Sequence, residues 1–479
     1  MSKFRIYFRS SSTAFISTIV TKVSAFVSVW ILNQVLTKEA YGNYEFAFSL
    51  ISILLILGSA GFQHIAMYRL SRIDAPPESL EGESLAGKLL KYSLMSSSLV
   101  SLIVVGVAFI WSGLENSFWI VGLTLLIPLK ALHGIYDAWF RARQLIAESI
   151  LYYEMLPAIA KVCFLCICWL IWPNIYVVVG AILLSEFLPL TVRYIMTPLN
   201  LFRVNKGSVL TLWDFKYAGQ LAITTGISKT VKYADILMMG ILATSTQVAE
   251  YVIASKLAFI LYLAHGINNK ILTPRIGNFL SNQDFASIHE EYHYSRILTL
   301  SCSFCGAIVF TLFGYQILEL FGEYGNSYST LMILCSTYLL TTSFGMSGGY
   351  LNIAGYSNLT LYTTILVLII NIGLNYWLIP ILGSDGAAVA MLVSFGVTNI
   401  ITSFLILYKD GVKTYSISLT IHTFFAVVIL LFRGFMIFNI VITTSVLLLI
   451  LVSLLYSERD FLRRLISNFN KYLTFQNGN

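Results

Sequence analysis

Charged residues are scarce in this sequence of 479 residues. Only 11% of them are Asp, Glu, Lys or Arg, whereas 57% are hydrophobic and the mean hydropathy is +0.79. A soluble domain usually carries about 25% charged residues, and a soluble protein of this length could not hide so much apolar side chain in its interior. Because a bilayer solvates apolar surface, the composition excludes a soluble protein and predicts an integral membrane protein.

Cysteine is also rare, and its positions exclude a disulfide framework. All of the cysteines lie inside apolar segments, where they act as small hydrophobic residues: Cys163, Cys166, Cys168, Cys302, Cys305 and Cys335. Lys3, Arg5 and Arg9 precede the first apolar run, as in a signal peptide. No A-x-A-like cleavage site follows, so we expect this run to be retained as the first helix.

Long apolar segments repeat along the chain. Crossing a bilayer takes about 20 apolar residues, and fourteen segments satisfy this length. They are 12–36, 42–68, 88–111, 117–138, 149–171, 175–197, 217–242, 248–272, 296–321, 328–351, 359–381, 386–408, 416–434 and 437–456. The sequence therefore predicts an all-α, polytopic membrane protein with about fourteen transmembrane helices.

The basic residues between these segments gather on one side of the predicted membrane. If the N-terminal tail and the even-numbered loops lie in the cytoplasm, the only basic residues predicted on the opposite side are Lys38 and Arg433. This bias follows the positive-inside rule, so we expect both termini to be cytoplasmic. The net charge of +7 reflects this distribution, and we expect no nucleic-acid partner.

Long external loops are absent, since none exceeds roughly ten residues between the predicted segments. A membrane enzyme that acts on bulky substrates usually needs a loop domain to hold its catalytic groups. Only the cytoplasmic stretches 69–88 and 272–296 offer modest room. We therefore expect that the chain performs no covalent chemistry.

A weak internal repeat appears when the chain is shifted by 207 residues. Tyr44, Ala47 and Leu50 then fall on Tyr251, Ala254 and Leu257. The even number of helices in each half gives both halves the same orientation, a plan that transporters reuse with the substrate between the halves; chance similarity of apolar segments is the alternative. We expect two pseudo-symmetric six-helix lobes, residues 1–205 and 206–410, followed by two extra transmembrane helices and a cytoplasmic tail in residues 411–479.

Residues 289–293, His-Glu-Glu-Tyr-His, match the H-E-x-x-H pattern of zinc proteases. There, two histidines on one helix face bind zinc and the glutamate activates water. No third ligand is obvious before the next segment. A polar helix on the membrane surface that joins the two halves explains the residues better.

Residues 82–89 resemble a phosphate-binding loop of the form G-x-x-x-x-G-K-[ST]. Leu89 replaces the hydroxyl that should reach magnesium, and Ala75-Pro76-Pro77 stands where a buried strand should precede the loop. A charged loop is the better explanation. The pairs Cys163/Cys166 and Cys302/Cys305 have a zinc-like spacing, but they lie inside spans without neighbouring histidines.

Ionisable residues inside the predicted spans are functional candidates, because each costs about 2.5–3.5 kcal/mol to insert. The basic ones are Lys22, Lys130, Lys161, Lys229, Lys232 and Lys256. The acidic ones are Asp137, Glu154, Glu186 and Asp235, with Glu45 and Glu250 nearer the outer ends.

Lys22 falls on Lys229 under the 207-residue shift, so the two lysines would face each other near the middle of the bilayer. This favours a cationic, water-filled cavity that receives an anion such as a pyrophosphate. The alternative is internal neutralisation on single helices. The pairs that would neutralise each other are Lys232 with Asp235, Glu154 with Lys161, and Glu186 with Arg193.

Several sequence stretches resemble the polysaccharide flippases. Tyr41-Gly42-Asn43-Tyr44, Gly58 to Gly61 and Arg69 are similar to the first helical hairpin of the family. Further stretches resemble its later helices: Leu351 to Gly355, Asn371 to Asn375, Leu378-Ile379-Pro380, Gly383 to Ala388, Asp235 with Tyr251 and Ala254, and Leu272-Thr273-Pro274. The resemblance covers about residues 10–410, most of the chain. The family is the Wzx-type branch of the multidrug/oligosaccharidyl-lipid/polysaccharide exporter superfamily.

The resemblance implies two six-helix lobes around a cationic cavity that opens alternately to each side. Its substrate class is undecaprenyl-pyrophosphate-linked oligosaccharide, such as an O-antigen repeat unit, which moves from the inner to the outer leaflet of the bacterial inner membrane. Coupling to H⁺ or Na⁺ is implied, without another cofactor. A polysaccharide polymerase and a chain-length regulator are further candidate partners, besides membrane lipid.

We assign the candidate site residues accordingly. The substrate-binding residues are Lys22, Lys229, Lys232 and Lys256, in place of the arginines common in the family; lysine also holds phosphate. The cation-coupling candidates are Asp235, Glu154 and Glu186. Three alternatives remain open: a lipid II flippase, a cation or drug antiporter of the same superfamily, and a membrane polysaccharide polymerase.

Overall fold

A computed structural model describes residues 2–72, 80–111, 114–196, 210–414, 416–434 and 439–459. Within these ranges every regular element is a helix, which confirms the predicted all-α class. The chain divides into two compact units, Met1–Ala249 (unit 1) and Glu250–Asn479 (unit 2). Arg203, Lys206 and the tail after residue 459 lie outside the described residues, as does the predicted lobe boundary after residue 205, which stays a prediction.

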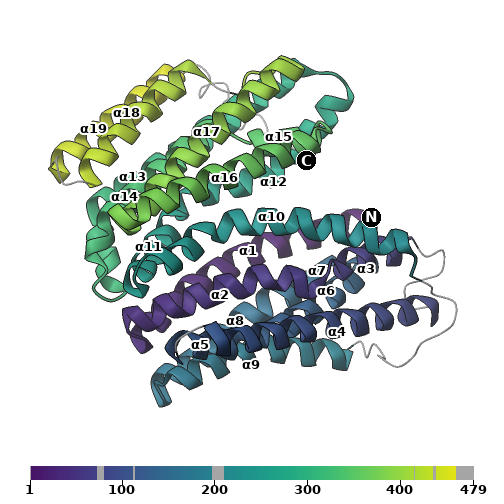
Figure 1. Cartoon of the computed structure of the whole chain (residues 1–479). Helices are drawn as coiled ribbons and strands as arrows, with labels where there is room; N and C mark the ends of the chain where they lie inside the picture. Colours follow the sequence, from purple (N-terminus) through teal and green to yellow (C-terminus); the bar gives the residue numbers. More distant parts are fainter. Residues whose placement is uncertain are drawn as a thin grey trace. The chain divides into compact units, whose positions relative to one another are not determined.

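Unit 1 consists of helices that follow the first seven predicted segments (Figure 1). They are α1 (Ser2–Val35), α2 (Lys38–Ser59), α3 (Phe62–Leu70), α4 (Leu80–Trp111), α5 (Leu114–Thr124), α6 (Leu126–Ala142), α7 (Ile146–Ile150), a π-helical turn η1 (Leu151–Met155), α8 (Leu156–Ile171), α9 (Ile175–Met196) and α10 (Leu212–Leu242). α11 (Ser245–Ala258) begins in this unit.

Unit 2 follows the remaining segments. It holds α12 (Ile260–Ser281), α13 (Phe285–Leu320), the short 3-10 turn η2 (Gly325–Ser327), α14 (Tyr328–Ser343), α15 (Ser347–Ile353), α16 (Ser357–Leu382), α17 (Ser384–Asp410), α18 (Ile417–Gly434) and α19 (Ile440–Ser457). α18 packs on α14, and α19 packs on α13 (Figure 1).

The described helices make the chain a multi-pass membrane protein. Eleven of them are long and apolar enough to cross a bilayer, and up to thirteen spans result if each of two bent pairs counts as one. These pairs are α11 with α12, bent by 48°, and α14 with α15, bent by 41°. α10 covers the predicted segment 217–242, whose three charges, Lys229, Lys232 and Asp235, lower its hydropathy.

A left-handed turn separates α2 from α3 within one predicted segment. Ala60 has φ 46° and Gly61 has φ 73°. A Cβ atom on Gly61 would lie 2.3 Å from the carbonyl oxygen of Ala218 in α10. This position therefore requires glycine for its backbone conformation and for the close approach of α10.

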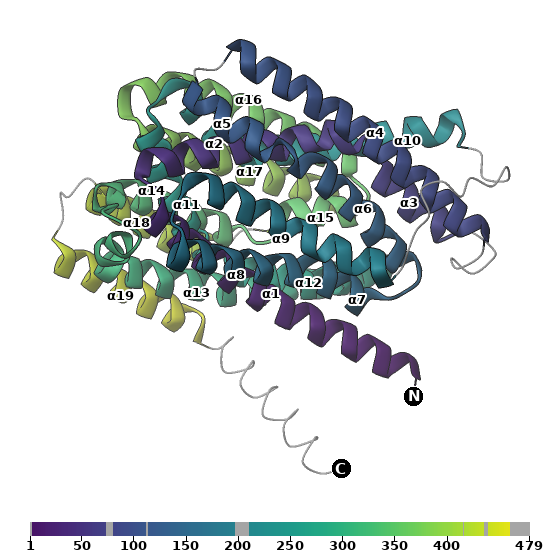
Figure 2. The same ribbon diagram turned by 90° about the horizontal axis from the view of Figure 1, so that it is seen from below.

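α10 packs along α2 and α3, so contacts place it in unit 1. At the predicted outer end of α2, glycines allow α2 to lie close to α10 and to the start of α11. A Cβ atom on Gly240 would lie 2.0 Å from the ring of Phe46, and one on Gly42 would lie 1.8 Å from the carbonyl oxygen of Ser245. α2 also contacts α4 and α5 (Figure 2), which makes it the central helix of this part of unit 1.

We expect Gly42→Ala to lower the free energy of unfolding of unit 1 by about 2–3 kcal/mol, because the added methyl group meets backbone that must move. Thermal unfolding in detergent measures the change. Gly106→Ala is the matched control, since a Cβ atom there has no neighbour within 4 Å and alanine favours a helix by about 1 kcal/mol. Equal melting temperatures for the two variants would contradict the close packing at Gly42.

An ion pair joins α3 to the start of α10. Arg69 donates two hydrogen bonds to Asp214, Nε to Oδ1 at 2.8 Å and Nη2 to Oδ2 at 2.5 Å. Thr211 donates to the same carboxylate from its backbone N–H at 2.8 Å and its hydroxyl at 2.9 Å. The side chain of Asp214 is fully buried. These donors, Arg69 first, lower the pKa of Asp214 to about 2.

Asp214 should therefore make stability depend on pH. Its pKa in the folded protein lies below the ordinary 3.8, so its contribution is present above about pH 4 and is lost as pH falls through about 2. We expect Asp214→Asn to lower the free energy of unfolding at pH 7 by on the order of 2 kcal/mol, with a smaller difference from wild type at pH 2–3. Asp284→Asn is the comparison, because among the described residues only Ser287 donates to that carboxylate and no arginine pairs with it, so its pH-dependent difference should be smaller. A difference that stays constant from pH 7 to 2 would contradict the ion pair.

In unit 2, the H-E-x-x-H residues hold helices together. Tyr292 donates a hydrogen bond to the carbonyl oxygen of Met346 at 2.8 Å, and His293 Nε2 lies 3.0 Å from a carboxylate oxygen of Glu458. Among the described residues no three His, Cys, Asp or Glu side chains gather as metal ligands. Residues 82–89 are also helical, in α4, and form no phosphate-binding loop. Tyr292 and His293 thus take part in packing within unit 2, and residues 82–89 are part of a helix.

Candidate functional site

Charged side chains from four helices of unit 1 gather within the predicted spans. Lys130 comes from α6, Lys161 from α8, Glu186 from α9 and Lys229 from α10. Each such group costs about 2.5–3.5 kcal/mol to place in a bilayer. Their concentration in one unit therefore indicates a site rather than scattered surface charge.

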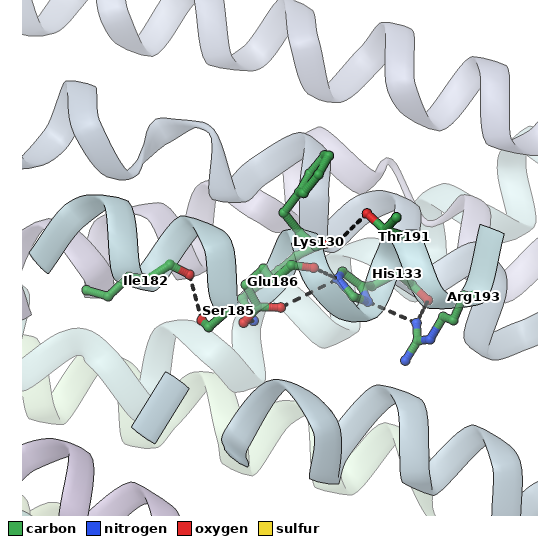
Figure 3. Close-up of polar contacts among 8 residues, drawn as sticks. Lys130, His133, Ile182, Ser185, Glu186, Thr191 and Arg193 are labelled. Carbon is green, nitrogen blue, oxygen red and sulfur yellow. Dashed lines mark hydrogen bonds and ion pairs between the residues drawn. The ribbon is translucent and has the colours of Figure 1, made fainter. Parts of the chain in front are cut away.

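Glu186 and Lys130 form the central ion pair of this cluster. Lys130 Nζ donates to Glu186 Oε1 at 2.7 Å (Figure 3), and the side chains are 36% and 15% exposed. The charge of Lys161 also acts on Glu186. Lys161 itself donates to the hydroxyl of Tyr44 at 3.3 Å. Glu186 is thus paired directly with Lys130, and Lys161 adds a second positive charge in the same region.

His133 lies between Glu186 and Arg193. Its Nε2 is 2.8 Å from the backbone carbonyl of Glu186, and its Nδ1 is 2.9 Å from Arg193 Nη1 (Figure 3). Arginine can only donate, so Nδ1 accepts and Nε2 carries the proton. These partners assign a neutral imidazole.

Arg193 is only 1% exposed. Its Nη1 also points to the carbonyl oxygen of His133 at 3.4 Å, and its guanidinium lies 5.6 Å from the centre of the Tyr153 ring. Nε and Nη2 have no hydrogen-bond partner among the described residues. Breaking the contact with His133 would therefore leave a buried charge almost unpaired.

The π-helical turn η1 holds Tyr153, which lies beside this cluster, and Glu154. π-turns inside α-helices occur frequently at functional sites. The ring of Tyr153 lies 6.4 Å from that of His133, between their centres. Glu154 accepts a hydrogen bond from Ser17 of α1 at 3.2 Å. Glu154 thus pairs across helices with a hydroxyl.

Lys229 is half-buried on α10 and makes no hydrogen bond or ion pair with any residue that the structure describes. The charges that act on it are those of Lys130 and Lys232. Lys232 is exposed and lies 5.1 Å from the ring of Tyr233. Asp235 is buried, with 6% of its surface exposed. A lysine flanked by two other lysines is an attractive position for an anion.

The predicted residues are only partly brought together. Glu186, Lys229 and Lys232 belong to the cluster around Lys130, and Lys22 is half-buried on α1 of the same unit. Lys256 is half-buried on the part of α11 that belongs to unit 2. The facing of Lys22 and Lys229 stays a prediction.

Neutralisation of Glu186 by Arg193, which the sequence left open as an alternative, is not the pairing that the structure shows. Residues seven apart are separated by about 10 Å along a helix, which is too far for direct contact. Lys130 on the neighbouring helix pairs with Glu186, and Arg193 turns to His133. Lys130 was a candidate only as a charge inside a predicted span, and neither it nor His133 or Arg193 was assigned to the site. Their spacing was a signal, since Lys130 and His133 share one face of α6, as Glu186 and Arg193 share one face of α9.

Comparisons with known proteins agree with this fold. Residues 221–377, about a third of the chain, match the MatE family model. No curated protein sequence matches the chain. A solved inward-facing multidrug resistance MATE transporter of the MOP superfamily is 14% identical, with a TM-score of 0.68 over 83% of this chain and 98% of that one.

Two other solved structures add to the comparison. The lipid II flippase MurJ, in an inward closed conformation, is 12% identical, with a TM-score of 0.66 over 95% of this chain and 99% of MurJ. A MOP superfamily transporter from Pyrococcus furiosus, described as having a binding pocket of reversed polarity, is 14% identical, with a TM-score of 0.58 over 86% and 96% of the two chains. The chain thus has the fold of MOP superfamily transporters.

Proposed function

We propose that the protein moves undecaprenyl-pyrophosphate-linked oligosaccharide, such as an O-antigen repeat unit, from the inner to the outer leaflet. The observation that carries the proposal is the excess of positive charge in the polar cluster of unit 1. Lys130 pairs with Glu186, and Lys229, beside the charges of Lys130 and Lys232, has no acidic partner among the described residues. Such a cluster suits an anionic head group, and the lipid tail can stay in the bilayer throughout.

The substrate-binding residues in this proposal are Lys22, Lys229, Lys232 and Lys256. Lys229 has no acidic partner among the described residues, so its charge is available to a diphosphate. Ammonium groups bind phosphate as point charges. Lys130 and Lys161 extend the site beyond the residues predicted from sequence, and Lys130 exchanges its carboxylate partner for substrate.

Glu186 is the coupling residue that the contacts favour, with Glu154 and Asp235 as further candidates. Its nearest side-chain groups are nitrogens, Lys130 Nζ at 2.7 Å and His133 Nε2 at 3.6 Å. Nitrogen donors that carry protons do not coordinate Na⁺, so they support H⁺ as the coupling ion. Protonation of Glu186 would release Lys130 to bind the diphosphate.

The setting of this function is the bacterial inner membrane, with both termini in the cytoplasm. A polysaccharide polymerase that receives the flipped unit and a chain-length regulator are the proposed partners. The protein performs no covalent chemistry in this account. It changes only the leaflet in which the lipid-linked sugar lies.

A lipid II flippase is the second candidate, because the structural match to MurJ extends over 95% of the chain. Its substrate is also an undecaprenyl diphosphate, so the same lysines would serve. A cation or drug antiporter is less well supported. The positive charges of Lys130, Lys161 and Lys229 would repel a cationic substrate.

Mass spectrometry of polyprenyl-linked oligosaccharides tests the proposal in cells that lack the gene. We expect a complete repeat unit to accumulate on undecaprenyl pyrophosphate and a plasmid copy to reverse this. Accumulation of lipid II instead would favour the second candidate. No accumulation, together with new sensitivity to cationic drugs, would overturn both in favour of an exporter.

A further inference from the structure

Three aromatic rings meet where α3 ends and α10 begins, at the predicted cytoplasmic side of unit 1. Tyr68, Trp213 and Tyr217 have ring centres 5.1 Å apart in all three pairs. Trp213 and Tyr217 stack with 9° between their planes. Trp213 remains 51% exposed. We name these three rings the aromatic platform.

Positive charge surrounds the aromatic platform. The guanidinium of Arg72 lies 4.0 Å from the centre of the Tyr68 ring and donates a hydrogen bond to the Tyr68 hydroxyl. Lys216 is exposed one residue before Tyr217. The carboxylate of Asp214 is buried and paired with Arg69. Among the residues that the structure describes, the exposed charged groups beside the rings are therefore cationic.

A polar track leads from the platform along α10 into the predicted span. Gln220, Thr224, Ser228 and Lys232 follow Trp213 on one helix face and are all exposed. Thr224 and Ser228 each donate to the carbonyl one turn earlier, at 3.0 and 3.1 Å, which leaves their oxygen lone pairs facing outward. A helix face turned to lipid is apolar, so this face borders water.

We propose that the aromatic platform is a docking site for the sugar of a diphosphate-linked glycan in the cytoplasmic leaflet. The apolar C–H face of a sugar ring packs on Trp213 and Tyr217, while Arg72 and Lys216 attract the diphosphate. The polar track then leads the head group toward Lys229 and Lys232. This inference rests on the proposed function and adds a recognition site for the sugar.

Aromatic side chains also anchor membrane proteins at the bilayer interface, so the two roles must be separated. An anchor contributes equally whatever substrate is transported. A sugar site contributes only when the substrate carries sugar. The charge on Arg72 and Lys216 is expected to serve any diphosphate.

The test compares two lipids in vesicles that contain the purified full-length protein. One is undecaprenyl pyrophosphate with its oligosaccharide, and the other is undecaprenyl pyrophosphate alone. We expect Trp213→Leu/Tyr217→Leu to lower the flipping rate of the glycan-linked lipid at limiting concentration about tenfold, since two ring contacts are lost. The rate for the sugar-free lipid should change less than twofold. Arg72→Gln/Lys216→Gln should lower both rates.

Two controls separate docking from anchoring and misfolding. Trp213→Phe keeps a flat ring and should keep the glycan rate within twofold. Trp377→Leu removes another exposed tryptophan, 65% exposed on α16, and should change neither rate. Three results would contradict sugar docking at the aromatic platform. They are an equal loss of rate for both lipids in Trp213→Leu/Tyr217→Leu, an unchanged rate for the glycan-linked lipid in that variant, and a similar loss of rate in Trp377→Leu. Wild-type protein that flips neither lipid would instead contradict the proposed function itself.

Discussion

Replacing Lys22 and Lys229 together with alanine is expected to lower the flipping rate by at least about a hundredfold, while folded protein stays in the membrane. Hydrogen bonds to charged groups contribute about 1.5–3 kcal/mol each, so the loss of two ammonium contacts to a diphosphate reaches this size. Lys229 has no acidic partner among the described residues, so its removal leaves no unpaired carboxylate. The rate is measured in vesicles with the glycan-linked lipid.

Two variants serve as controls for this effect. Lys22→Arg/Lys229→Arg keeps both charges and should retain much of the rate. Lys409→Ala removes an exposed lysine at the end of α17 and should leave the rate unchanged. Full activity of the double alanine variant would show that the diphosphate is bound elsewhere.

Replacing Glu186 with alanine is expected to destabilise unit 1 by about 3–5 kcal/mol, because it removes the carboxylate that pairs with Lys130. It also removes the carboxylate beside His133. Thermal unfolding in detergent should show a clearly lower melting temperature. The same variant should lose coupled transport, since Glu186 is the proposed proton site.

A double variant distinguishes charge pairing from packing. Lys130→Met/Glu186→Leu removes both charges of the pair and should recover a large part of the lost stability, because well-packed apolar residues often replace a buried ion pair without cost. Glu154→Ala removes an exposed carboxylate with one hydroxyl partner, and should cost less than about 0.5 kcal/mol. The pairing of Lys130 with Glu186 would be contradicted if the double variant lost more stability than Glu186→Ala.

The fold could be predicted well from the sequence, because helices that are solvated by lipid appear as long apolar segments. Each of the fourteen predicted segments lies largely on described helices. The interruptions inside segments could not be predicted in the same way. The break at Ala60 and Gly61 and the π-turn η1 depend on how α10 and α1 pack, through Ala218 and Ser17. Hydropathy carries no information on such contacts.

The site was harder to predict, because pairing between charges is decided by tertiary packing. The sequence marked Glu186 and Lys229 as candidates, and the structure brings both near Lys130. It gave no means to choose Lys130 over Arg193 as the partner of Glu186. His133 was not among the candidates, although it joins Glu186 to Arg193.

The central claim is that this protein moves a diphosphate-linked glycan across a bilayer. Its most direct test uses vesicles that contain the purified protein and undecaprenyl pyrophosphate with a labelled oligosaccharide. A membrane-impermeant glycosidase then reports how much glycan has reached the outer leaflet. The account predicts rapid exposure with the wild-type protein and almost none with Lys22→Ala/Lys229→Ala. The account would be contradicted if the glycan reached the outer leaflet no faster than in protein-free vesicles, while the same protein preparation exchanged H⁺ for a cationic dye.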